Sequence, residues 1–152
     1  MALTGKLESE KEINAPAKKF FHCLIDLPNL FHKAVVHESH RTKVLEGDGK
    51  SLGSAVHFNY ALDGKTVSNT AARIEALDEG KNLITFGCYD GDVMKHYKVL
   101  KVHFQVIPRH HKSSVKWSIE YEKVKESVPE PFDYMDFEEK MLEGIDSLAL
   151  ES

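Results

Sequence analysis

Apolar and polar residues alternate along most of the chain between Leu3 and Val124, which is the spacing of strands with one buried face. In the clearest case, Val56, Phe58 and Tyr60 share one face of a predicted strand. Turn signals separate most of these segments, and Asp63-Gly64 is the strongest of them. The pattern predicts seven strands, over residues 3–13, 35–45, 54–62, 65–77, 82–89, 95–107 and 113–124.

Two stretches have the period of a helix instead. Between Pro16 and Pro28, apolar residues recur at helical spacing, which predicts a short helix over 17–25. Pro28 interrupts this run, and we expect a second short helix after it, over 29–33. After Pro131 the period changes from two to about 3.6, which predicts a closing helix over 132–150. Its apolar stripe consists of Tyr134, Met135, Met141, Leu142, Ile145, Leu148 and Ala149.

The order of these elements contains no signal for a parallel crossover, so it indicates an antiparallel α+β fold. A length of 152 residues suits one domain spanning residues 1–152, which would bury roughly 70% of its unfolded surface. A meander of strands beside one amphipathic helix has to curl around that helix to bury both apolar faces. Imperfect closure of such a sheet would leave a hollow.

Composition excludes several classes of function. Hydrophobic residues make up 41% of the chain and the net charge is -4 without a basic stripe, so nucleic acid is not an expected partner. No apolar run approaches the ~20 residues of a membrane span, and the charged N-terminus does not fit a signal peptide. We therefore expect a cytoplasmic protein that does not enter membranes. Cys23 and Cys88 form no C-x-x-C pair and are expected to be reduced.

Motifs for phosphate, metal or nucleophilic chemistry are weak. Gly49-Lys50-Ser51 ends like a phosphate-binding loop, but Val44 stands where that motif needs glycine. Among nine histidines, His37 and His40 lie close in sequence, yet an odd separation on a strand predicts opposite faces. No Gly-x-Ser-x-Gly or Cys-His signature is present. We expect no metal and no cofactor.

Two charged residues fall on faces that are otherwise apolar. Lys98 precedes Leu100 and Val102 on one predicted strand, and Glu138 lies within the stripe of the last helix. A charged group facing an apolar pocket could act as an acid, a base or a ligand anchor, and His96 beside Lys98 adds a third candidate. The alternative is that Lys98 reaches water near the strand end and Glu138 lies at the edge of the stripe.

Aromatic and sulfur-bearing side chains concentrate on the predicted inner faces. They are compatible with a filled core and equally with the wall of a pocket, because both require apolar inward faces. The set comprises Phe58, Tyr60, Phe86, Cys88, Trp117, Tyr121, Met135 and Met141.

Short segments along nearly the whole chain resemble the major latex proteins in order and spacing. They include Leu-Thr-Gly-Lys-Leu-Glu at residues 3–8, Asp63-Gly64-Lys65, Asp90-Gly91-Asp92, His96-Tyr97-Lys98 and the run from Trp117 to Lys123. The major latex proteins belong to the larger plant superfamily of pathogenesis-related class ten proteins and the birch pollen allergen. The start of the last helix, Pro131 to Tyr134, looks most like members from poppies.

This resemblance implies the helix-grip fold, in which a seven-stranded antiparallel sheet wraps around the C-terminal helix and two short helices support it. It also implies a large cavity for hydrophobic hormones, flavonoids, steroids, alkaloids or terpenoids, which favours a pocket wall over a filled core. On that basis the expected ligand-binding residues are Leu24, Phe31, Val56, Phe58, Tyr60, Ile84, Phe86, Cys88, Lys98, Leu100, Val102, Trp117, Ile119, Tyr121, Met135, Glu138, Met141 and Leu142.

Two functions follow from the resemblance. The first is a binding or carrier protein for a hydrophobic plant molecule, with a role in defence or specialised metabolism. The alternative is a cofactor-independent isomerase or cyclase that acts on alkaloids or terpenoids, with Lys98, His96 and Glu138 as candidate acid and base groups. An exposed edge strand allows a weak homodimer, although a monomer is equally compatible with the sequence.

Overall fold

The computed structural model describes residues 3–152, which form an antiparallel α+β fold of seven strands and three helices, as the sequence predicts. A short 3-10 turn, Asp92–Lys95, precedes the sixth strand. The strands are β1 (Thr4–Glu12), β2 (Arg41–Glu46), β3 (Ala55–Ala61), β4 (Val67–Asp78), β5 (Leu83–Asp90), β6 (Tyr97–Ile107) and β7 (Ser114–Lys123). The helices are α1 (Ala17–Ile25), α2 (Leu27–Ala34) and α3 (Phe132–Glu151).

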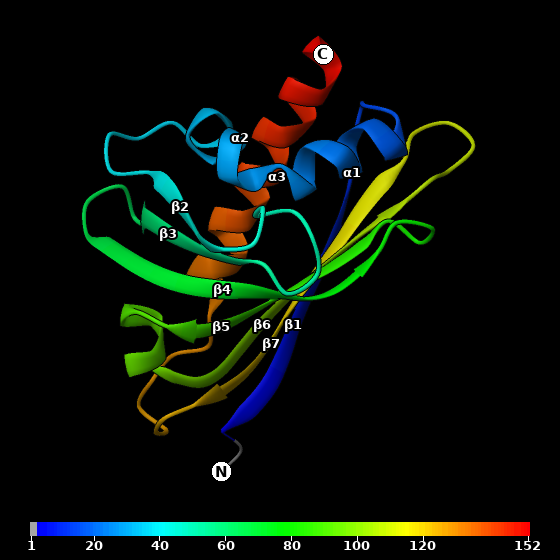
Figure 1. Ribbon diagram of the computed structural model, residues 1–152. Coiled ribbons are helices and arrows are strands. Elements are labelled where there is room, and N and C mark those ends of the chain that lie inside the picture. The colour runs from blue at the N-terminus through cyan, green and yellow to red at the C-terminus, as the bar shows by residue number, and fades with distance from the viewer. Residues whose placement is uncertain (1–2) are drawn as a thin grey trace.

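All seven strands belong to one sheet with the order β1-β7-β6-β5-β4-β3-β2. Strands β2 to β7 follow one another as a meander, and β1 returns to pair with β7 in antiparallel register. Figure 1 shows the sheet curving around α3, while α1 and α2 lie against the C-terminal half of that helix. This is the helix-grip arrangement, and it leaves the concave face of the sheet opposite the N-terminal half of α3.

A missing side chain lets the helices approach one another closely. A Cβ atom added to Gly144 on α3 would overlap the backbone carbonyl of Ala34 at the end of α2. Only glycine fits at this crossing, because any side chain would push α2 away from α3. The position of α2 matters for the site described below, since α2 closes one end of it.

The Asp63-Gly64 turn between β3 and β4 forms as the sequence predicts. Gly64 has a φ of 77°, in the left-handed region that favours glycine. The Asp63 side chain accepts hydrogen bonds from the backbone N–H groups of Lys65 and Thr66, both at 2.8 Å. These bonds fix the register in which Phe58 pairs with Thr70 across the two strands.

Two predicted boundaries near α2 are wrong. The helix begins at Leu27 rather than at residue 29, because Pro28 occupies the first turn, where its missing N–H is tolerated. The strand predicted from Val35 begins only at Arg41. Residues 37–40 form a turn in which the N–H of His40 bonds the carbonyl of His37 at 3.1 Å.

This turn also overturns the expectation that His37 and His40 point to opposite faces. Their ring centroids are 4.9 Å apart. The argument from odd separation holds for an extended strand and fails in a turn. The ring of His40 packs in turn against Phe31 and Phe137, with centroids 5.5 and 5.4 Å away.

Within residues 3–152, no helix is long and apolar enough to cross a lipid bilayer.

Candidate ligand-binding cavity

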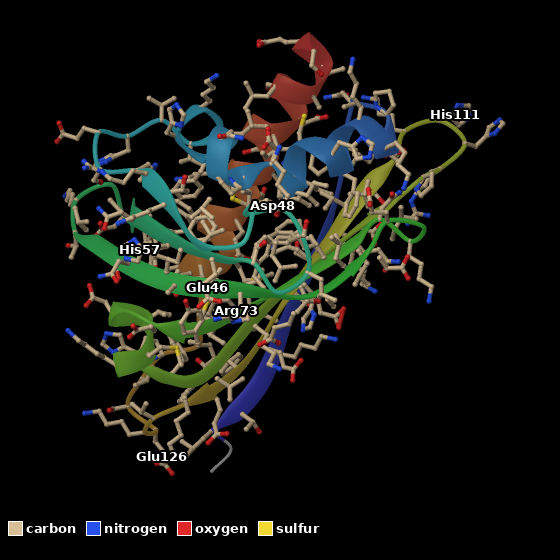
Figure 2. The ribbon with its side chains drawn as sticks, viewed as in Figure 1. Glu46, Asp48, His57, Arg73, His111 and Glu126 are labelled. Carbon is tan, nitrogen blue, oxygen red and sulfur yellow. The ribbon has the colours of Figure 1, made fainter. Side chains whose placement is uncertain are left out.

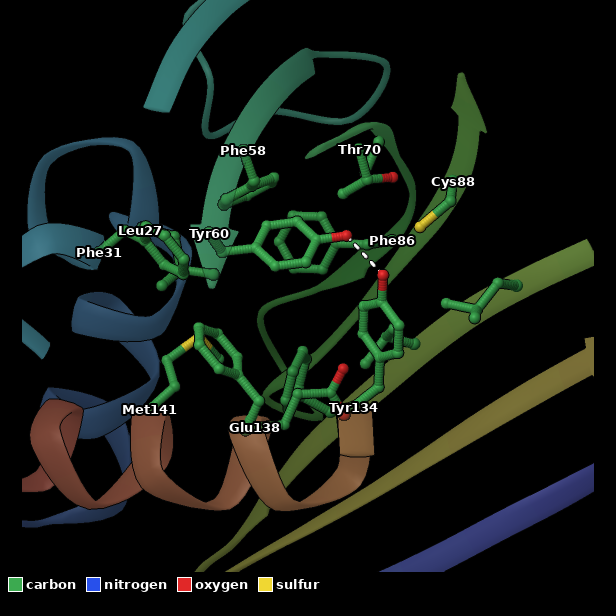
Figure 3. Close-up of a pocket in the computed structure, with 15 residues that line it drawn as sticks. Leu27, Phe31, Phe58, Tyr60, Thr70, Phe86, Cys88, Tyr134, Glu138 and Met141 are labelled. Atoms are coloured by element: carbon green, nitrogen blue, oxygen red, sulfur yellow. Dashed lines mark hydrogen bonds between the residues drawn. The ribbon is translucent and has the colours of Figure 1, made fainter. Parts of the chain in front are cut away.

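A cavity lies between the concave face of the sheet, α2 and the first half of α3 (Figure 3). Six elements contribute to its wall, and β1, β7 and α1 contribute none of the fifteen lining residues. The lining comprises Leu27 and Phe31 from α2, Phe58 and Tyr60 from β3, Thr70 and Ala72 from β4, Phe86 and Cys88 from β5, Leu100, Val102 and Phe104 from β6, and Tyr134, Phe137, Glu138 and Met141 from α3.

The cavity is apolar and rich in aromatic rings. Seven of the fifteen lining side chains are aromatic, and Phe31, Phe58, Phe86 and Phe104 form a continuous row of edge-to-face contacts. The row has centroid separations of 5.3, 6.4 and 6.3 Å, in the range that such pairs prefer. The space open to the centre of a water-sized molecule is about 90 Å³. A ligand that needs more space than this can bind only if lining side chains move. Met141 is suited to such movement, because its unbranched thioether side chain is flexible.

Two tyrosine hydroxyls meet at one end of the cavity. Tyr60 from β3 and Tyr134 from α3 share a hydrogen bond of 2.6 Å, drawn as a dashed line in Figure 3. Burial raises the pKa of both phenols above the ordinary value of 10, and in Tyr134 the neighbouring Tyr60 raises it further. Both hydroxyls therefore stay protonated at neutral pH and act as neutral hydrogen-bonding groups.

Cys88 and Thr70 add two small polar groups on adjacent strands. Burial raises the pKa of the Cys88 thiol to about 11, so the thiolate is not populated at neutral pH. The residue as a whole is half-buried, and its side chain lines the cavity. Thr70 donates to the backbone carbonyl of Asp90 at 3.4 Å, and this contact holds its hydroxyl at the sheet. Neither group supplies a charge to the site.

Glu138 is the exception in this neutral lining. Its side chain lies on α3 and points toward the cavity in Figure 3, and the residue is only 7% exposed. No residue between 3 and 152 forms a hydrogen bond with its Oε1 atom. Burial alone raises the pKa of this carboxyl well above its ordinary value of 4.5. Burial in the empty cavity therefore favours the neutral acid form of Glu138 over the carboxylate.

The structure brings half of the sequence-predicted lining together around this cavity. Phe31, Phe58, Tyr60, Phe86, Cys88, Leu100, Val102, Glu138 and Met141 all contribute to its wall. Most of these residues lie at inward positions of β3, β5 and β6, where the alternation of the sequence gives the correct face.

The other half lies elsewhere. Leu24, Val56, Ile84, Ile119 and Leu142 are at most 1% exposed and belong to the filled core. Trp117 and Met135 line a separate crevice between β1, β7 and the start of α3. Tyr121 packs against Tyr97 beneath Gly5. These residues face inward as predicted, but none of them lines the cavity between the sheet, α2 and α3.

Lys98 does not face the cavity, and the reason is a β-bulge. The register of β6 against β7 shifts between Tyr97 and Val99, so Tyr97 turns inward and Lys98 turns outward. The ammonium group lies 3.8 Å from Glu122 with 59% of the side chain exposed. His96 is also exposed. Of the three candidate acid and base groups, only Glu138 therefore reaches the cavity.

Six lining residues are absent from the sequence-predicted set: Leu27, Thr70, Ala72, Phe104, Tyr134 and Phe137. Phe104 shares the alternation of Leu100 and Val102, and this signal was sufficient to include it. Phe137 precedes Glu138 on the buried face of α3, outside the narrower stripe that the sequence suggests. Thr70 and Ala72 carry no signal of their own, because small residues are common on inner and outer faces alike.

The glycine-rich loop between β2 and β3 has no free phosphate cradle. The carboxylate of Asp48 accepts hydrogen bonds from the backbone N–H groups of Lys50 and Ser51 at 2.9 and 2.8 Å. These bonds, with the Ser51 hydroxyl, hold the pKa of Asp48 well below its usual range. Figure 2 shows Asp48 in this loop, and His111 in the distant turn between β6 and β7.

Across residues 3–152, no three His, Cys, Asp or Glu side chains group closely enough to hold a metal ion.

Comparison with known proteins adds the evolutionary context. The model of the pathogenesis-related protein Bet v 1 family matches residues 2–152. MLP-like protein 43 of Arabidopsis thaliana is 40% identical over 152 residues, covering 98% of this chain and 95% of that protein. Major latex protein 146 of Papaver somniferum is 31% identical, covering 95% of this chain and 91% of the poppy protein. These identities are taken over whole chains, so the local likeness of residues 131–134 to poppy members stays a prediction.

The fold is shared with solved structures. The crystal structure of ginseng major latex-like protein 151 from Panax ginseng superimposes with a TM-score of 0.85 at 28% identity, covering 98% of this chain and 99% of that one. The seven-stranded sheet around a long C-terminal helix is thus the common architecture of these proteins and of the present chain.

Proposed function

This chain belongs to the Bet v 1 family, and from that premise we propose that it binds a hydrophobic plant small molecule in the cavity beneath β3 to β6. The bound molecule belongs to the chemical range of hormones, alkaloids, terpenoids, flavonoids or steroids. The role is that of a carrier in defence or specialised metabolism, carried out in the cytoplasm as a monomer or weak homodimer.

One observation carries the proposal. The cavity presents an almost entirely apolar wall with seven aromatic rings, together with a few polar groups at defined positions. Ligand pockets in proteins share this composition, in which apolar walls supply affinity and a small number of polar atoms set orientation. Within residues 3–152, the Oε1 atom of Glu138 has no hydrogen-bond partner. It is therefore the polar atom of the lining that we expect a ligand to bond.

An isomerase or cyclase acting in the same cavity is less well supported. Proton removal at one atom and return at another requires an acid and a base with matched pKa values. Lys98 and His96 lie outside the cavity. Among the lining residues only Glu138 carries a carboxyl group, whereas the pKa of Cys88 is about 11 and burial raises the pKa values of both tyrosines. A single acid supports binding better than a two-step transfer.

The first experiment incubates the purified protein with a fractionated plant metabolite extract, separates bound from free material, and follows both over time by chromatography with mass detection. Compounds enriched unchanged on the protein establish a carrier. A product that grows in the free pool with time establishes an enzyme and contradicts the carrier assignment.

A matched pair of variants ties the result to the cavity. Ala72→Phe places a ring into the cavity, and Ala76→Phe makes the same change on the same strand at a position outside the lining. We expect Ala72→Phe to abolish enrichment of the bound compounds and uptake of the neutral dye N-phenylnaphthylamine, and Ala76→Phe to preserve both. Thermal melting checks that both variants fold, because overpacking can cost about 1–3 kcal/mol. Equal binding by the two variants would refute the assignment of the cavity.

A further inference from the structure

Glu138 narrows the class of ligand that fits this cavity. Resting on the carrier function proposed above, we propose that the cavity selects apolar molecules that carry one basic nitrogen, and that proton release accompanies binding of such a molecule. Glu138 is the group that pairs with the nitrogen.

The first argument is the unmet hydrogen-bonding capacity of Glu138. Its Oε1 atom is buried and has no partner in the described part of the chain. An unsatisfied buried polar group destabilises a fold, so its retention on the buried face of α3 needs an explanation. A ligand group placed at the carboxyl removes the deficit. Nitrogen bonded to hydrogen is the strongest such group, because its bond to a carboxylate is charge-assisted.

The second argument is charge complementarity. None of the fifteen lining residues is Lys, Arg or His. The charged groups that act on the tyrosine pair are acidic, since Asp92 and Asp133 contribute to the raised pKa values of Tyr60 and Tyr134 respectively. Asp92 is itself paired with Lys95 at 3.1 Å, so the selectivity rests on the lining. The lining offers no cation to a ligand carboxylate, whereas Glu138 offers an acidic partner to a ligand nitrogen.

The third argument is the wall itself. Aromatic faces attract cations through the negative charge above the ring, and proteins use such walls to hold ammonium groups. Glu138 lines the same cavity as seven aromatic side chains, among them Phe137, which packs against Phe31 and Tyr60 with ring centroids 6.0 and 5.9 Å away. A nitrogen near the Glu138 carboxyl would therefore lie among aromatic rings rather than in water.

Few other titratable groups share the cavity with Glu138. They are Tyr60 from β3, Cys88 from β5, and Tyr134 on α3 itself. The remaining neighbours on α2, β4 and β6 are Leu27, Phe31, Thr70, Ala72, Leu100, Val102 and Phe104, which do not titrate. All three titratable neighbours have raised pKa values and stay neutral. Glu138 is therefore the lining residue expected to exchange a proton with a basic ligand.

The proton balance follows directly. In solution the amine carries one proton as an ammonium ion, and the neutral acid form of Glu138, which burial favours, carries another. Once paired, the nitrogen and the carboxyl share a single proton, and the second passes to the buffer. The count is the same whether the shared proton lies on nitrogen or on oxygen. A neutral ligand releases none, because it leaves the Glu138 proton in place.

The test uses three probes with one apolar body and different head groups: naphthylmethylamine, naphthylmethanol and naphthoic acid. Titration calorimetry at about pH 6, in two buffers with different ionisation enthalpies, gives the affinity and the number of protons released. For the wild-type protein we expect the amine to bind at least about tenfold more tightly than the alcohol, and the acid to bind more weakly than either. We expect proton release with the amine, up to one proton per bound molecule, and none with the alcohol.

A pair of variants isolates the carboxyl. Glu138→Gln keeps the shape and a hydrogen-bond donor but cannot ionise, and should weaken amine binding by at least about tenfold while leaving the alcohol within about threefold. Glu139→Gln makes the same change at the next residue of α3, which is half exposed and 3.9 Å from Lys11. It should leave the affinities for all three probes and the released proton unchanged.

Two results would overturn the proposal: equal wild-type affinities for the amine and the alcohol, or equal losses for both probes in Glu138→Gln. Failure of this inference remains distinguishable from failure of the carrier function. If N-phenylnaphthylamine binds and Ala72→Phe blocks it, the cavity is a binding site whatever the head group. If the dye and all three probes fail to bind, the carrier function itself is wrong.

Discussion

Helix α3 carries two buried carboxyl groups, eight residues apart, in opposite situations. Asp146 is 8% exposed and accepts hydrogen bonds from the backbone N–H groups of Asn14 and Ala15 and from the Asn14 side chain, at 2.8 to 3.2 Å. Glu138 is 7% exposed, and its Oε1 atom has no partner within residues 3–152. The two groups are equally buried, so burial alone says nothing about their roles.

The difference lies in what surrounds each group. Asp146 holds the segment between β1 and α1 against the last helix, so its carboxylate stabilises the fold. Glu138 faces a space that the protein leaves open, and its carboxyl costs free energy until something else fills that space. For these two carboxyl groups, the full set of partners at Asp146 supports a role in the fold, and the missing partner of Glu138 beside open space supports a role in binding.

The largest effect is expected from Asp146→Ala. The substitution leaves the N–H groups of Asn14 and Ala15 without their acceptor in a buried or partly buried position. We expect the free energy of unfolding to fall by about 3 kcal/mol, as measured by urea denaturation. The control is Glu143→Ala, which removes an exposed carboxylate 2.9 Å from Lys11 and should cost less than about 1 kcal/mol. Similar losses of unfolding free energy in the two variants would mean that the hydrogen bonds of Asp146 to Asn14 and Ala15 do not stabilise the fold.

The opposite sign is expected at Glu138. Replacing Glu138 by Leu removes a desolvated carboxyl and keeps an apolar side chain of similar size. The free energy of unfolding should rise by about 1 kcal/mol at neutral pH. Urea denaturation of the ligand-free proteins provides the measurement. A loss of stability instead would indicate that the carboxyl is satisfied in solution, which would remove the contrast with Asp146.

This gain should grow with pH. Because burial raises the pKa of Glu138 above 4.5, the folded protein keeps a proton that the unfolded chain has released. The unfolded state then binds fewer protons than the folded state, so wild-type stability falls as pH rises above that value. Glu138→Leu lacks this dependence, and its advantage should widen by up to about 1.4 kcal/mol per pH unit until the folded pKa is passed. Urea denaturation at a series of pH values measures this slope, and a constant difference would contradict the raised pKa.

A smaller effect is expected where the cavity satisfies its own polar groups. Tyr134→Phe removes the hydroxyl that bonds Tyr60 at 2.6 Å and should lower the free energy of unfolding by about 1 kcal/mol. The double variant with Tyr60→Phe should lose less than the sum of the single losses, because the second change removes the group that the first left unpaired. Strict additivity in thermal or urea unfolding would show that the two hydroxyls do not interact.

The smallest effect is expected from Lys98→Met. Lys98 is exposed on the outer side of β6, so both stability and ligand affinity should stay close to those of the wild type, with less than about 0.5 kcal/mol of change in unfolding. Calorimetry with naphthylmethylamine checks the affinity. A large loss of binding would place Lys98 at the ligand after all, and turnover that survives the change would exclude Lys98 from any catalytic mechanism.

The elements of the fold were predictable because their periods are local properties of the sequence. The last helix was expected over 132–150 and spans Phe132–Glu151, and the last strand was expected over 113–124 and spans Ser114–Lys123. The errors occur where a neighbouring element decides. The turn of His37 and His40 follows the end of α2, and the bulge at Lys98 arises from pairing with β7.

The site was only partly predictable, for a related reason. Alternation identifies the inward face of a strand, so Phe58, Phe86 and Val102 were recognised correctly as inward residues. Val56 on β3 and Ile84 on β5 lie on the same inward faces as Phe58 and Phe86, but they are fully buried among other side chains. The sequence does not distinguish these positions, because whether space remains above a side chain depends on where α2 and α3 cross the sheet.

The sequence by itself determined the strands, the helices, the faces that are buried, and the presence of a carboxyl in the apolar stripe of α3. Only the tertiary structure decided what that carboxyl means. The Asp146 carboxylate accepts a hydrogen bond from the backbone N–H of Asn14, 132 positions earlier in the chain, whereas the Glu138 side chain faces an open cavity. Hydrogen-bond partners so distant in sequence are set by the packing of the sheet and helices, and no local pattern encodes them.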